Sequence, residues 1–578
     1  MRMIVLPLVL LQISVLLSCM KETTGVLLTE ETSVNATSAF PTDATLLTLS
    51  QLRQVTDNST TKKYYTTDEG KHGYWYLDAA DKTSKDNTGT IVVTSAGKRF
   101  KRVYKDTVNV NWFGAMGNNV ECTKNFQNAV NAGRIIYVPD GTYLITVANG
   151  DRNLSIWLKS NQTLLLSKNA NIKAKPNNLS RYYLVKILSA TNVTIDGGMF
   201  TGDKQQHSGT SGESGHLIGI LNSKDVKIKN TTIRDAWGDG IYVGSDFADQ
   251  SSERVTIDKV NVENSRRNGL SIVAGKNITV SNSSFSGSKG TKPESGIDIE
   301  PNSGMVATDI YLKSIKVFNN AGAGVMSTEH AERVNANSIT AYENQWGIRI
   351  NSSGLNTFIN LNVYENVASG VYMNYAKNTV IKYSKSYKNG EHGFYVLNST
   401  GTHKFLYCSA WENTDGFSSH GEGVEISMDS CTARNNKSYG FNMGTSKTSL
   451  QASHAYRNAK AGVLLMNYAK AISNNIYENG EQGLRVYGSY GIYQKNKIHS
   501  NSQRSNASKD NIEVAAGASQ NLITANTLRT GTLTNKPRYG LNITSSSCRN
   551  NNVYPNDMKG SGVVKDLQNS GTATIATP

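Results

Sequence analysis

The sequence predicts an all-β fold, a single-stranded right-handed parallel β-helix of ~12 coils or more, with an N-terminal helix cap and a small module before it. A Gly followed by alternating apolar residues recurs from Gly240 to Gly483, at intervals of 27 to 29 residues and then of 21 to 24. Three short strands and three bends fit into such an interval. By strand alternation, positions one and three after each Gly point inward and positions two and four point outward. An Asn also recurs before the Gly, from Asn320 to Asn479, and indicates amides that hydrogen-bond from coil to coil.

The N-terminal segment, residues 1–19, predicts export. Its apolar run from Ile4 to Leu17 is too short for a membrane helix but suits a secretory signal peptide. The run ends in Ser18-Cys19, which resembles a bacterial lipobox with Cys19 as the lipidated residue; an ordinary signal peptide with an incidental Cys is the alternative. We therefore expect a bacterial outer-membrane or cell-surface lipoprotein, or else a periplasmic or secreted protein.

Four further segments follow in order. Residues 20–65 are rich in Thr and Ser and indicate a stalk, and residues 66–110 indicate a small β module. The β-helix is expected over residues 111–555. Residues 556–578 are expected to form a C-terminal tail, because the repeat has faded there.

One segment has helical rather than strand patterning. Between Cys122 and Ala132, the residues Phe126, Ala129 and Val130 share one helical face. An exposed coil end is an unpaired sheet edge, so we expect this helix to cover the N-terminal end of the coil stack.

Two columns of side chains each leave two interpretations open. Cys408 and Cys431 lie one coil apart in the inward phase, either as stacked thiols or as a disulfide bridge. An outward column of mostly aromatic residues either stacks on sugar rings or shields strand edges. This column consists of Phe318, Tyr342, Tyr364, Tyr387, Trp411, Arg434, Tyr456 and Tyr477.

Several stretches carry a family resemblance. Residues 112–117 read Trp-Phe-Gly-Ala-Met-Gly, residues 126–130 read Phe-Gln-Asn-Ala-Val, and residues 137–143 read Tyr-Val-Pro-Asp-Gly-Thr-Tyr. They resemble the opening segment of the pectate-lyase-like β-helix superfamily. Upstream, residues 73–76 (Gly-Tyr-Trp-Tyr) and 99–104 (Arg-Phe-Lys-Arg-Val-Tyr) are similar to the small module before that segment in phage tailspike depolymerases.

This resemblance implies a right-handed β-helix that acts on polysaccharide. It does not select the reaction, because lyases, hydrolases, epimerases and noncatalytic adhesins share the superfamily. In that superfamily an acidic pair usually follows the FGA-x-G segment, and this chain has Asn118-Asn119 there instead. The acidic pair belongs to the cap, so its replacement removes no catalytic group.

Outward positions of one strand face form the first candidate site. Six polar or aromatic residues take these positions: Arg349, Tyr372, Tyr395, Asn351, Asn374 and His420. Adjacent coils lie ~4.8 Å apart and alternate residues on a strand ~6.5 Å apart, so the six residues would share a patch on the order of 15 Å across.

The chemistry of this patch suits β-elimination from a uronic acid. Arg349, with the neighbouring amides, would stabilise the developing enolate charge, and His420 would be the base. Tyr395 or Tyr372 would be the acid, or the base if a nearby cation lowered its pKa. Ser419 breaks the apolar inward phase beside His420, where we expect a functional departure. The alternative is that these are ordinary polar groups on a solvated sheet face.

A second candidate site is acidic and includes Asp239, Asp298 and Glu300. Asp298 and Glu300 share a face at ~6.5 Å, near the spacing at which two carboxyls divide acid and base roles in glycoside hydrolysis. With Asp239 they would alternatively bind Ca²⁺, the one cofactor the sequence suggests, or contact substrate hydroxyls. Arg266 and Arg267, one coil before Asp298, are further substrate-binding candidates; the alternative is that one of them forms an ion pair with Asp298 or Glu300.

The net charge of the chain limits the classes of binding partner. Lys and Arg number 60 and Asp and Glu 45, a net charge of +15 that attracts polyanions. Export disfavours nucleic acid, and membrane contact is expected only through the lipid anchor. We therefore expect a polysaccharide lyase for an acidic, uronate-containing polysaccharide, with glycosaminoglycans such as chondroitin sulfate or hyaluronan ahead of pectin or alginate. The alternatives are a glycoside hydrolase using Asp298, Glu300 and Asp239, and a noncatalytic glycan-binding surface protein.

Overall fold

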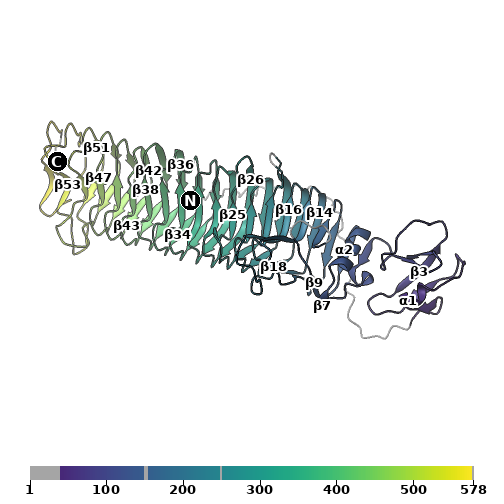
Figure 1. Ribbon diagram of the computed structural model, residues 1–578. Helices are drawn as coiled ribbons and strands as arrows, with labels where there is room; N and C mark the ends of the chain where they lie inside the picture. Colours follow the sequence, from purple (N-terminus) through teal and green to yellow (C-terminus); the bar gives the residue numbers. More distant parts are fainter. Residues whose placement is uncertain (1–39, 149–153, 248–249, 576–578) are drawn as a thin grey trace, which may run out of the picture. The chain divides into compact units, whose positions relative to one another are not determined.

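The computed structural model describes residues 40–148, 154–247 and 250–575 (Figure 1). The expected signal peptide with Cys19, and residues 20–39 of the expected stalk, lie outside these ranges. Two α-helices occur in the described residues, α1 (Leu49–Leu52) and α2 (Thr123–Ala132), with one 3₁₀ helix over Val110–Phe113. Neither of these α-helices is long and apolar enough to cross a membrane.

Five strands between residues 45 and 102 form the N-terminal module, in the order β1-β2-β3-β5-β4. They are β1 (Thr45–Leu47), β2 (Tyr64–Thr66), β3 (Gly73–Asp78), β4 (Ile91–Val93) and β5 (Arg99–Arg102). The sheet therefore starts inside the segment 20–65 that composition indicated as a stalk. Leu47, Leu49 and Leu52 are buried in the module's core with Trp75 and Phe100, and the surrounding Ser and Thr residues had obscured this apolar spacing.

From Thr107 onward the chain winds into a right-handed parallel β-helix with three ladders of paired strands, seen in Figure 1 as coils stacked side by side. Each strand pairs in parallel with the corresponding strand of the next coil. Ladder 1 positions the candidate site. Its strands are β10 (Ile156–Leu158), β13 (Arg181–Leu188), β16 (Ser214–Leu221), β19 (Ile241–Gly244), β22 (Leu270–Ile272), β25 (Ile297–Ile299), β27 (Ala323–Ser327), β29 (Trp346–Asn351), β32 (Val371–Asn374), β35 (Phe394–Leu397), β38 (Phe417–His420), β41 (Phe441–Met443), β44 (Val463–Leu465), β47 (Leu484–Val486), β50 (Ile512–Val514), β53 (Tyr539–Ile543) and β54 (Lys565–Asn569).

Ladders 2 and 3 are joined by two long strands, β26 (Ala307–Phe318) and β28 (Glu332–Tyr342), which belong to both. The other strands of ladder 2 are β6 (Thr107–Asn109), β8 (Ile135–Val138), β11 (Thr163–Leu166), β14 (Thr191–Asp196), β17 (Lys224–Lys229), β20 (Ser252–Asp258), β23 (Gly275–Ser281), β30 (Thr357–Ile359), β33 (Val380–Lys382), β36 (Gly401–Leu406), β39 (Val424–Asp429), β42 (Thr448–Gln451), β45 (Lys470–Ile472), β48 (Ile492–Gln494) and β51 (Leu522–Thr524). Those of ladder 3 are β7 (Asn118–Glu121), β9 (Gly141–Ile145), β12 (Ala170–Ala174), β15 (Met199–Thr201), β18 (Thr232–Arg234), β21 (Asn261–Glu263), β24 (Ser284–Ser286), β31 (Asn362–Tyr364), β34 (Lys385–Tyr387), β37 (Ser409–Trp411), β40 (Thr432–Arg434), β43 (His454–Tyr456), β46 (Asn475–Tyr477), β49 (Lys497–His499) and β52 (Thr527–Arg529).

The interior follows the predicted phase. The alternating apolar residues after each Gly are buried, as at Val371 and Met373. The Asn column is also confirmed, because each side-chain amide donates to the next Asn; Asn389 Nδ2, for example, lies 3.0 Å from Asn413 Oδ1. Cys408 and Cys431 are buried free thiols, so the stacked-thiol interpretation is correct.

The coil stack is covered at its N-terminal end and extended at its C-terminal end. In α2, the residues Phe126, Ala129 and Val130 are buried in the core as predicted, so their helix face packs onto the first coils. At the other end the segment 556–578 is not simply a tail. Strand β54 pairs with β53, with Leu567 opposite Leu541, and so adds a further rung to ladder 1.

Candidate functional site

The outward side chains of ladder 1 form one line in register, as the repeat phase predicted. Successive partners are Lys186, Gly219, Tyr242, Ser271, Asp298, Met326, Arg349, Tyr372, Tyr395, Ser418 and Asn442. Three cavities, of about 430, 220 and 590 Å³, lie along the N-terminal half of this line. Arg181 and Tyr183 line both the first and the second, and Arg267 and Glu300 line both the second and the third. Neighbouring cavities therefore share wall residues along ladder 1 from β10 to β29, and we refer to this row of cavities as the groove.

The acidic cluster lies at the centre of this groove. Asp239, in the bend before β19, is fully buried and accepts hydrogen bonds from Arg267 Nη1 (3.2 Å to Oδ2) and from the backbone N–H of Asn268 (3.0 Å to Oδ1). Asp298, on β25, is also buried, and its Oδ2 accepts from Asn268 Nδ2 at 2.9 Å. Glu300 follows two residues later and lines the second and third cavities. Asn268 and Arg267 thus hold two buried carboxyls beside one that faces the groove.

The two buried carboxyls have different surroundings. Burial raises the pKa of Asp298 well above its usual value, and the charge of Glu300 raises it further, although Arg267 acts in the opposite direction. Burial by itself would lower the pKa of Arg267, but the carboxylates of Asp239, Asp298 and Glu213 outweigh burial and raise it. Burial therefore favours the protonated form of Asp298, next to a guanidinium whose charge the surrounding carboxylates stabilise.

His216 and Tyr242 complete the wall of the second cavity, and sequence reasoning did not select either as functional. His216 Nδ1 accepts the backbone N–H of Asp239 (3.1 Å), so Nε2 carries the proton. Burial lowers the pKa of His216 to about 4 despite the opposing charge of Asp239, so the ring is neutral at neutral pH. It stacks on Tyr242 with 4.7 Å between ring centroids. The outward phase of Tyr242 was a usable signal, whereas His216 lies before the first Gly of the regular repeat.

The two neighbouring arginines have separate environments. Arg267 forms an ion pair with Asp239, one coil before it, rather than the pair with Asp298 or Glu300 that the sequence suggested. The guanidinium of Arg266 instead lies 3.9 Å from the Trp237 ring centroid and donates from Nη1 to the carbonyl of Gly212 at 2.8 Å. Both residues lie in the bend between β21 and β22, where the chain direction changes, and only Arg267 reaches the carboxyl cluster.

The calcium site expected at Asp298, Glu300 and Asp239 is not formed. Within residues 40–148, 154–247 and 250–575, no group of three or more His, Cys, Asp or Glu side chains is arranged to hold a metal ion. The physical reason is that Asp239 is occupied by Arg267, while burial raises the pKa of Asp298 and so disfavours the ionised form that would bind a cation. A calcium ion prefers several ionised oxygen ligands at once.

The first predicted patch lies further along the same ladder. Arg349 lies 4.8 Å from the Trp346 ring centroid and lines the third cavity, and Tyr372 is its register partner. Asn374 Nδ2 donates to Asn351 Oδ1 at 3.1 Å, so these two amides link neighbouring coils.

His420 lies at the far end of the predicted patch from Arg349, on a strand three register steps away. His420 meets the Tyr395 ring edge-on with 5.8 Å between centroids, and its coil lies three strand spacings from Arg349, ~14 Å. The carboxylate and the C5 proton of a uronate belong to adjacent carbons of one sugar. The residue that neutralises the carboxylate and the residue that removes the C5 proton must therefore both contact that sugar. Burial also raises the pKa of Tyr372, even against the charge of Arg349, and lowers the pKa of His420.

Sequence reasoning missed two groups beside Tyr395. The His392 ring centroid lies 4.5 Å from that of Tyr395, and its Nδ1 lies 3.5 Å from Asp415 Oδ2. Asp415 also accepts from Asn442 Nδ2 at 3.0 Å. Burial would raise the pKa of Asp415, but hydrogen bonds from His392, Asn442 and the Tyr439 backbone lower it. Both groups lie in bends just before a Gly of the repeat, and this position could have identified them from the sequence.

Two other expected features have structural explanations. Ser419 is fully buried, with its hydroxyl 2.8 Å from that of Thr445, so this polar inward position is satisfied inside the core. The aromatic column faces outward as expected, but its rings are stacked face to face; Tyr387 and Trp411, for example, have centroids 4.4 Å apart at an interplanar angle of 3°. Because each ring covers its neighbour's face, the interior of the column offers no face on which a sugar ring stacks.

Two family descriptions match the chain. A phage tail protein small four-stranded beta-sheet domain matches residues 45–105, and a right handed beta helix region matches residues 216–312 and 295–454. The first match begins where the N-terminal module begins in the structure. The second spans the coils that carry the acidic cluster and the Arg349 to His420 patch.

Three known proteins illustrate the similarity. YclG of Bacillus subtilis (strain 168) is 31% identical over 187 residues, 28% of this chain and 32% of YclG. The SPbeta prophage-derived YorA of the same strain is 30% identical over 210 residues, 32% of this chain and 36% of YorA. These matches therefore span about a third of each relative's length. Tailspike protein gp49 of Acinetobacter baumannii bacteriophage Fri1, a capsular polysaccharide depolymerase, is 12% identical, with coverage of 78% and 72% of the two chains and a TM-score of 0.41.

The ladders of paired strands and the match to the right handed beta helix region agree with each other. The described chain is a right-handed parallel β-helix, and its residues 216–454 are those that match this family description.

Proposed function

We propose that this protein hydrolyses glycosidic bonds of a polysaccharide by acid–base catalysis at Asp298 and Glu300. The observation that carries the proposal is a carboxyl pair at one strand, one member buried with its pKa raised well above the usual value, the other lining the groove. Acid–base cleavage of a glycoside depends on two carboxyls whose surroundings give them different pKa values, so that one is protonated while the other is ionised. The groove runs from β10 to β29, eight strands at ~4.8 Å spacing, which gives it room for several sugar units.

The proton path follows from the hydrogen bonds. Asp298 Oδ2 accepts from Asn268, so the proton of the neutral carboxyl is on Oδ1, which has no hydrogen-bond partner among the described residues. Because Asp298 Oδ1 is itself buried, this proton passes through Glu300, which lines the groove, to the oxygen of the leaving sugar as the glycosidic bond breaks. Glu300 then takes a proton from the water that attacks the anomeric carbon. Glu300 passes this proton to Asp298, which restores the starting protonation of both carboxyls.

Arg267 and His216 have supporting roles. The Arg267 guanidinium holds Asp239 and lines the second and third cavities beside Glu300, where it favours a negatively charged sugar or a developing negative charge. Neutral His216 lines the second cavity with Nε2–H as its donor toward a substrate oxygen.

Release of reducing ends from a panel of acidic and neutral polysaccharides tests this proposal. We expect Glu300→Gln and Asp298→Asn each to reduce kcat by ~10²- to 10⁴-fold. Glu253→Gln is the matched control, because Glu253 is a carboxylate on ladder 2 that pairs with Lys224, outside the groove. Wild-type turnover by the Glu300→Gln enzyme would exclude this catalytic assignment.

Uronate β-elimination is a second candidate, favoured by the pairing of Arg349 with Tyr372. Arg349 shares the third cavity with Arg267 and Lys292, three cations beside which a uronate carboxylate would be neutralised. Tyr372, with a raised pKa, suits the acid role toward the leaving oxygen. In this reaction the new double bond absorbs ultraviolet light. Absorbance that rises with the reducing ends supports the lyase, reducing ends alone support the hydrolase, and neither signal on any polymer supports a noncatalytic glycan-binding protein.

We also propose that the substrate is acidic, with glycosaminoglycans as the first polymers to assay, and that the protein is exported with a lipid on Cys19. The net charge of +15 and the cations of the groove support the first point, and the apolar run before Cys19 supports the second. Mass spectrometry of the N-terminal peptide from a bacterial host tests the anchor. An unmodified Cys19, or a mature chain without it, would contradict lipidation.

A further inference from the structure

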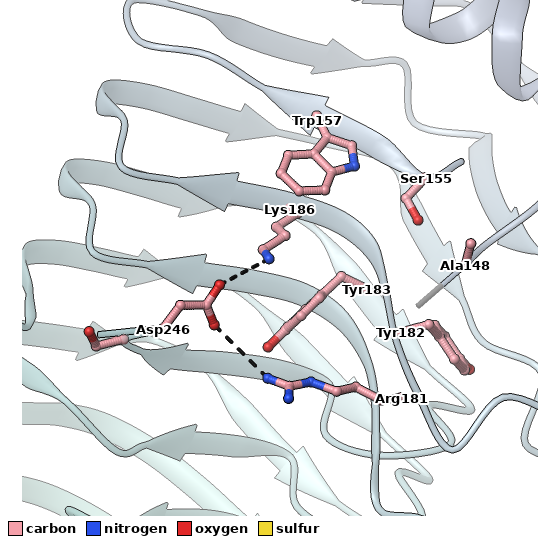
Figure 2. A pocket seen from close by; sticks show the side chains of 9 residues that line it. Ala148, Ser155, Trp157, Arg181, Tyr182, Tyr183, Lys186 and Asp246 are labelled. Carbon is pink, nitrogen blue, oxygen red and sulfur yellow. Dashed lines mark hydrogen bonds and ion pairs between the residues drawn. The ribbon is translucent and has the colours of Figure 1, made fainter. Parts of the chain in front are cut away.

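We propose that the cavity at the N-terminal end of the groove is a subsite for a sugar with a negative charge, either a carboxylate or a sulfate. The cavity, of about 430 Å³, is lined mainly by residues of β10, β13 and the segment after β19. Figure 2 shows Asp246 between Lys186 and Arg181, with the Tyr183 ring beside them and Trp157 above. The inference rests on the proposed function in one respect, namely that the polysaccharide runs along ladder 1.

The charges of this cavity are unbalanced. Lys186 Nζ lies 3.1 Å from Asp246 Oδ2, and an Arg181 Nη2 lies 4.0 Å from Asp246 Oδ1. Among the described residues that line the cavity, two cations therefore share one carboxylate. The Lys186 side chain is only 11% exposed, whereas that of Arg181 is 58% exposed. Lys186 satisfies Asp246 from inside, so the Arg181 guanidinium is the group that faces an incoming ligand.

The aromatic residues favour an anion over a neutral sugar. A neutral sugar is typically recognised by an open aromatic face and hydroxyl acceptors. Here the Lys186 ammonium lies 4.9 Å from the Trp157 ring centroid and 5.0 Å from that of Tyr183, so it occupies ring faces that a sugar would use. What the cavity presents is positive charge beside apolar walls, where water screens it less than on an open surface.

The backbone is shaped to hold this arrangement. Trp157 and Lys186 are register partners on β10 and β13, and the next partner of Lys186 is Gly219 on β16. A Cβ at Gly219 would collide with the Tyr183 ring. The absence of a side chain at Gly219 therefore lets this ring lie over β16, where Tyr183 lines both the first and the second cavity.

The subsite lies at a defined distance from the proposed reaction centre. Four strand spacings separate Lys186 from Asp298 along the register, ~19 Å in all. Arg181 lines the cavity next to Glu300 as well, so a chain that reaches from Glu300 to Lys186 stays in contact with the protein. The anionic group recognised here thus belongs to a sugar several units away from the bond that is cut.

Binding to catalytically impaired protein tests the inference. In the Glu300→Gln background, calorimetry measures the affinity for three size-matched oligosaccharides: one with uronates, one with sulfates and one neutral. We expect Arg181→Gln to weaken binding of an anionic ligand by ~10- to 100-fold, and to reduce its dependence on salt. Lys186→Met should weaken it as well. Arg254→Gln is the control, since it removes the same charge from an exposed Arg254–Asp225 pair on ladder 2.

Each outcome bears on the subsite. Loss confined to the uronate or to the sulfate ligand identifies the anion. Unchanged affinity of the Arg181→Gln protein, or an equal loss for the neutral ligand, would overturn the proposal. Arg181 is largely exposed, so its replacement leaves the core intact, and thermal unfolding checks the less exposed Lys186 variant. Because the readout is binding, a failure of wild-type protein to cleave any glycan would contradict the proposed function without affecting this result.

Discussion

Replacing Asp298 by Asn should increase stability at neutral pH while it removes activity. Asp298 is buried, and its pKa is raised by burial and by Glu300. In the unfolded chain the same carboxyl ionises above about pH 4. As pH rises from there toward the folded-state pKa, the unfolded chain releases a proton that the folded protein retains, so stability falls. Each unit of raised pKa corresponds to about 1.4 kcal/mol. Asparagine keeps the shape of the neutral carboxyl and carries no such pH dependence.

Thermal unfolding of the wild type and the Asp298→Asn variant, below pH 4 and near pH 8, measures the effect. The two proteins should unfold at similar temperatures in acid. Near pH 8 the unfolding temperature of the variant should rise by ~1–3 °C for each 1 kcal/mol gained in the free energy of unfolding. Asp415→Asn is a control of opposite sign. The lowered pKa of Asp415 adds stability that is present above about pH 4 and lost as pH falls, so this variant should be destabilised near pH 8 and not in acid. A loss of stability for Asp298→Asn near pH 8 would refute the neutral-carboxyl assignment.

Four further predictions concern single contacts. Arg267→Met should cost about 3–5 kcal/mol by leaving Asp239 buried and unpaired, and addition of Asp239→Asn should recover part of that loss in urea unfolding. Asn389→Ala should cost about 2–4 kcal/mol in the same assay, because it interrupts the amide column and leaves buried donors without acceptors. His420→Ala should leave cleavage rates within about twofold if chemistry occurs at Glu300; a ~10²-fold loss would shift it to the Tyr395 patch. Gly219→Val should weaken anionic oligosaccharide binding in calorimetry by ~10-fold, by displacing the Tyr183 ring.

Features that depend on strand alternation were predictable from the sequence. The period of the repeat places Met373 inward and Tyr372 outward in one coil, and the same phase holds in the next, where Tyr395 is the register partner of Tyr372. The amide column from Asn320 to Asn479 follows for the same reason. Alternation is a local property of the backbone, and a constant coil length repeats it at one place in the cross-section.

Contacts made through the bends were not predictable in this way. Arg266 and Arg267 are neighbours in the chain, yet one stacks on Trp237 and the other pairs with Asp239. His392 reaches Tyr395 from a bend whose direction no period specifies. The segment boundaries depended on averaged composition, which concealed the few buried leucines of the N-terminal module.

The sequence by itself determined the solenoid, its phase and the face on which Asp298 and Arg349 lie, because these depend on a period that each coil repeats. Only the tertiary structure decided that Asp298 is buried with a raised pKa, and that Arg267 rather than Arg266 pairs with Asp239. The physical reason is that protonation and contact depend on burial and on distances between coils, which are set where irregular bends pack together.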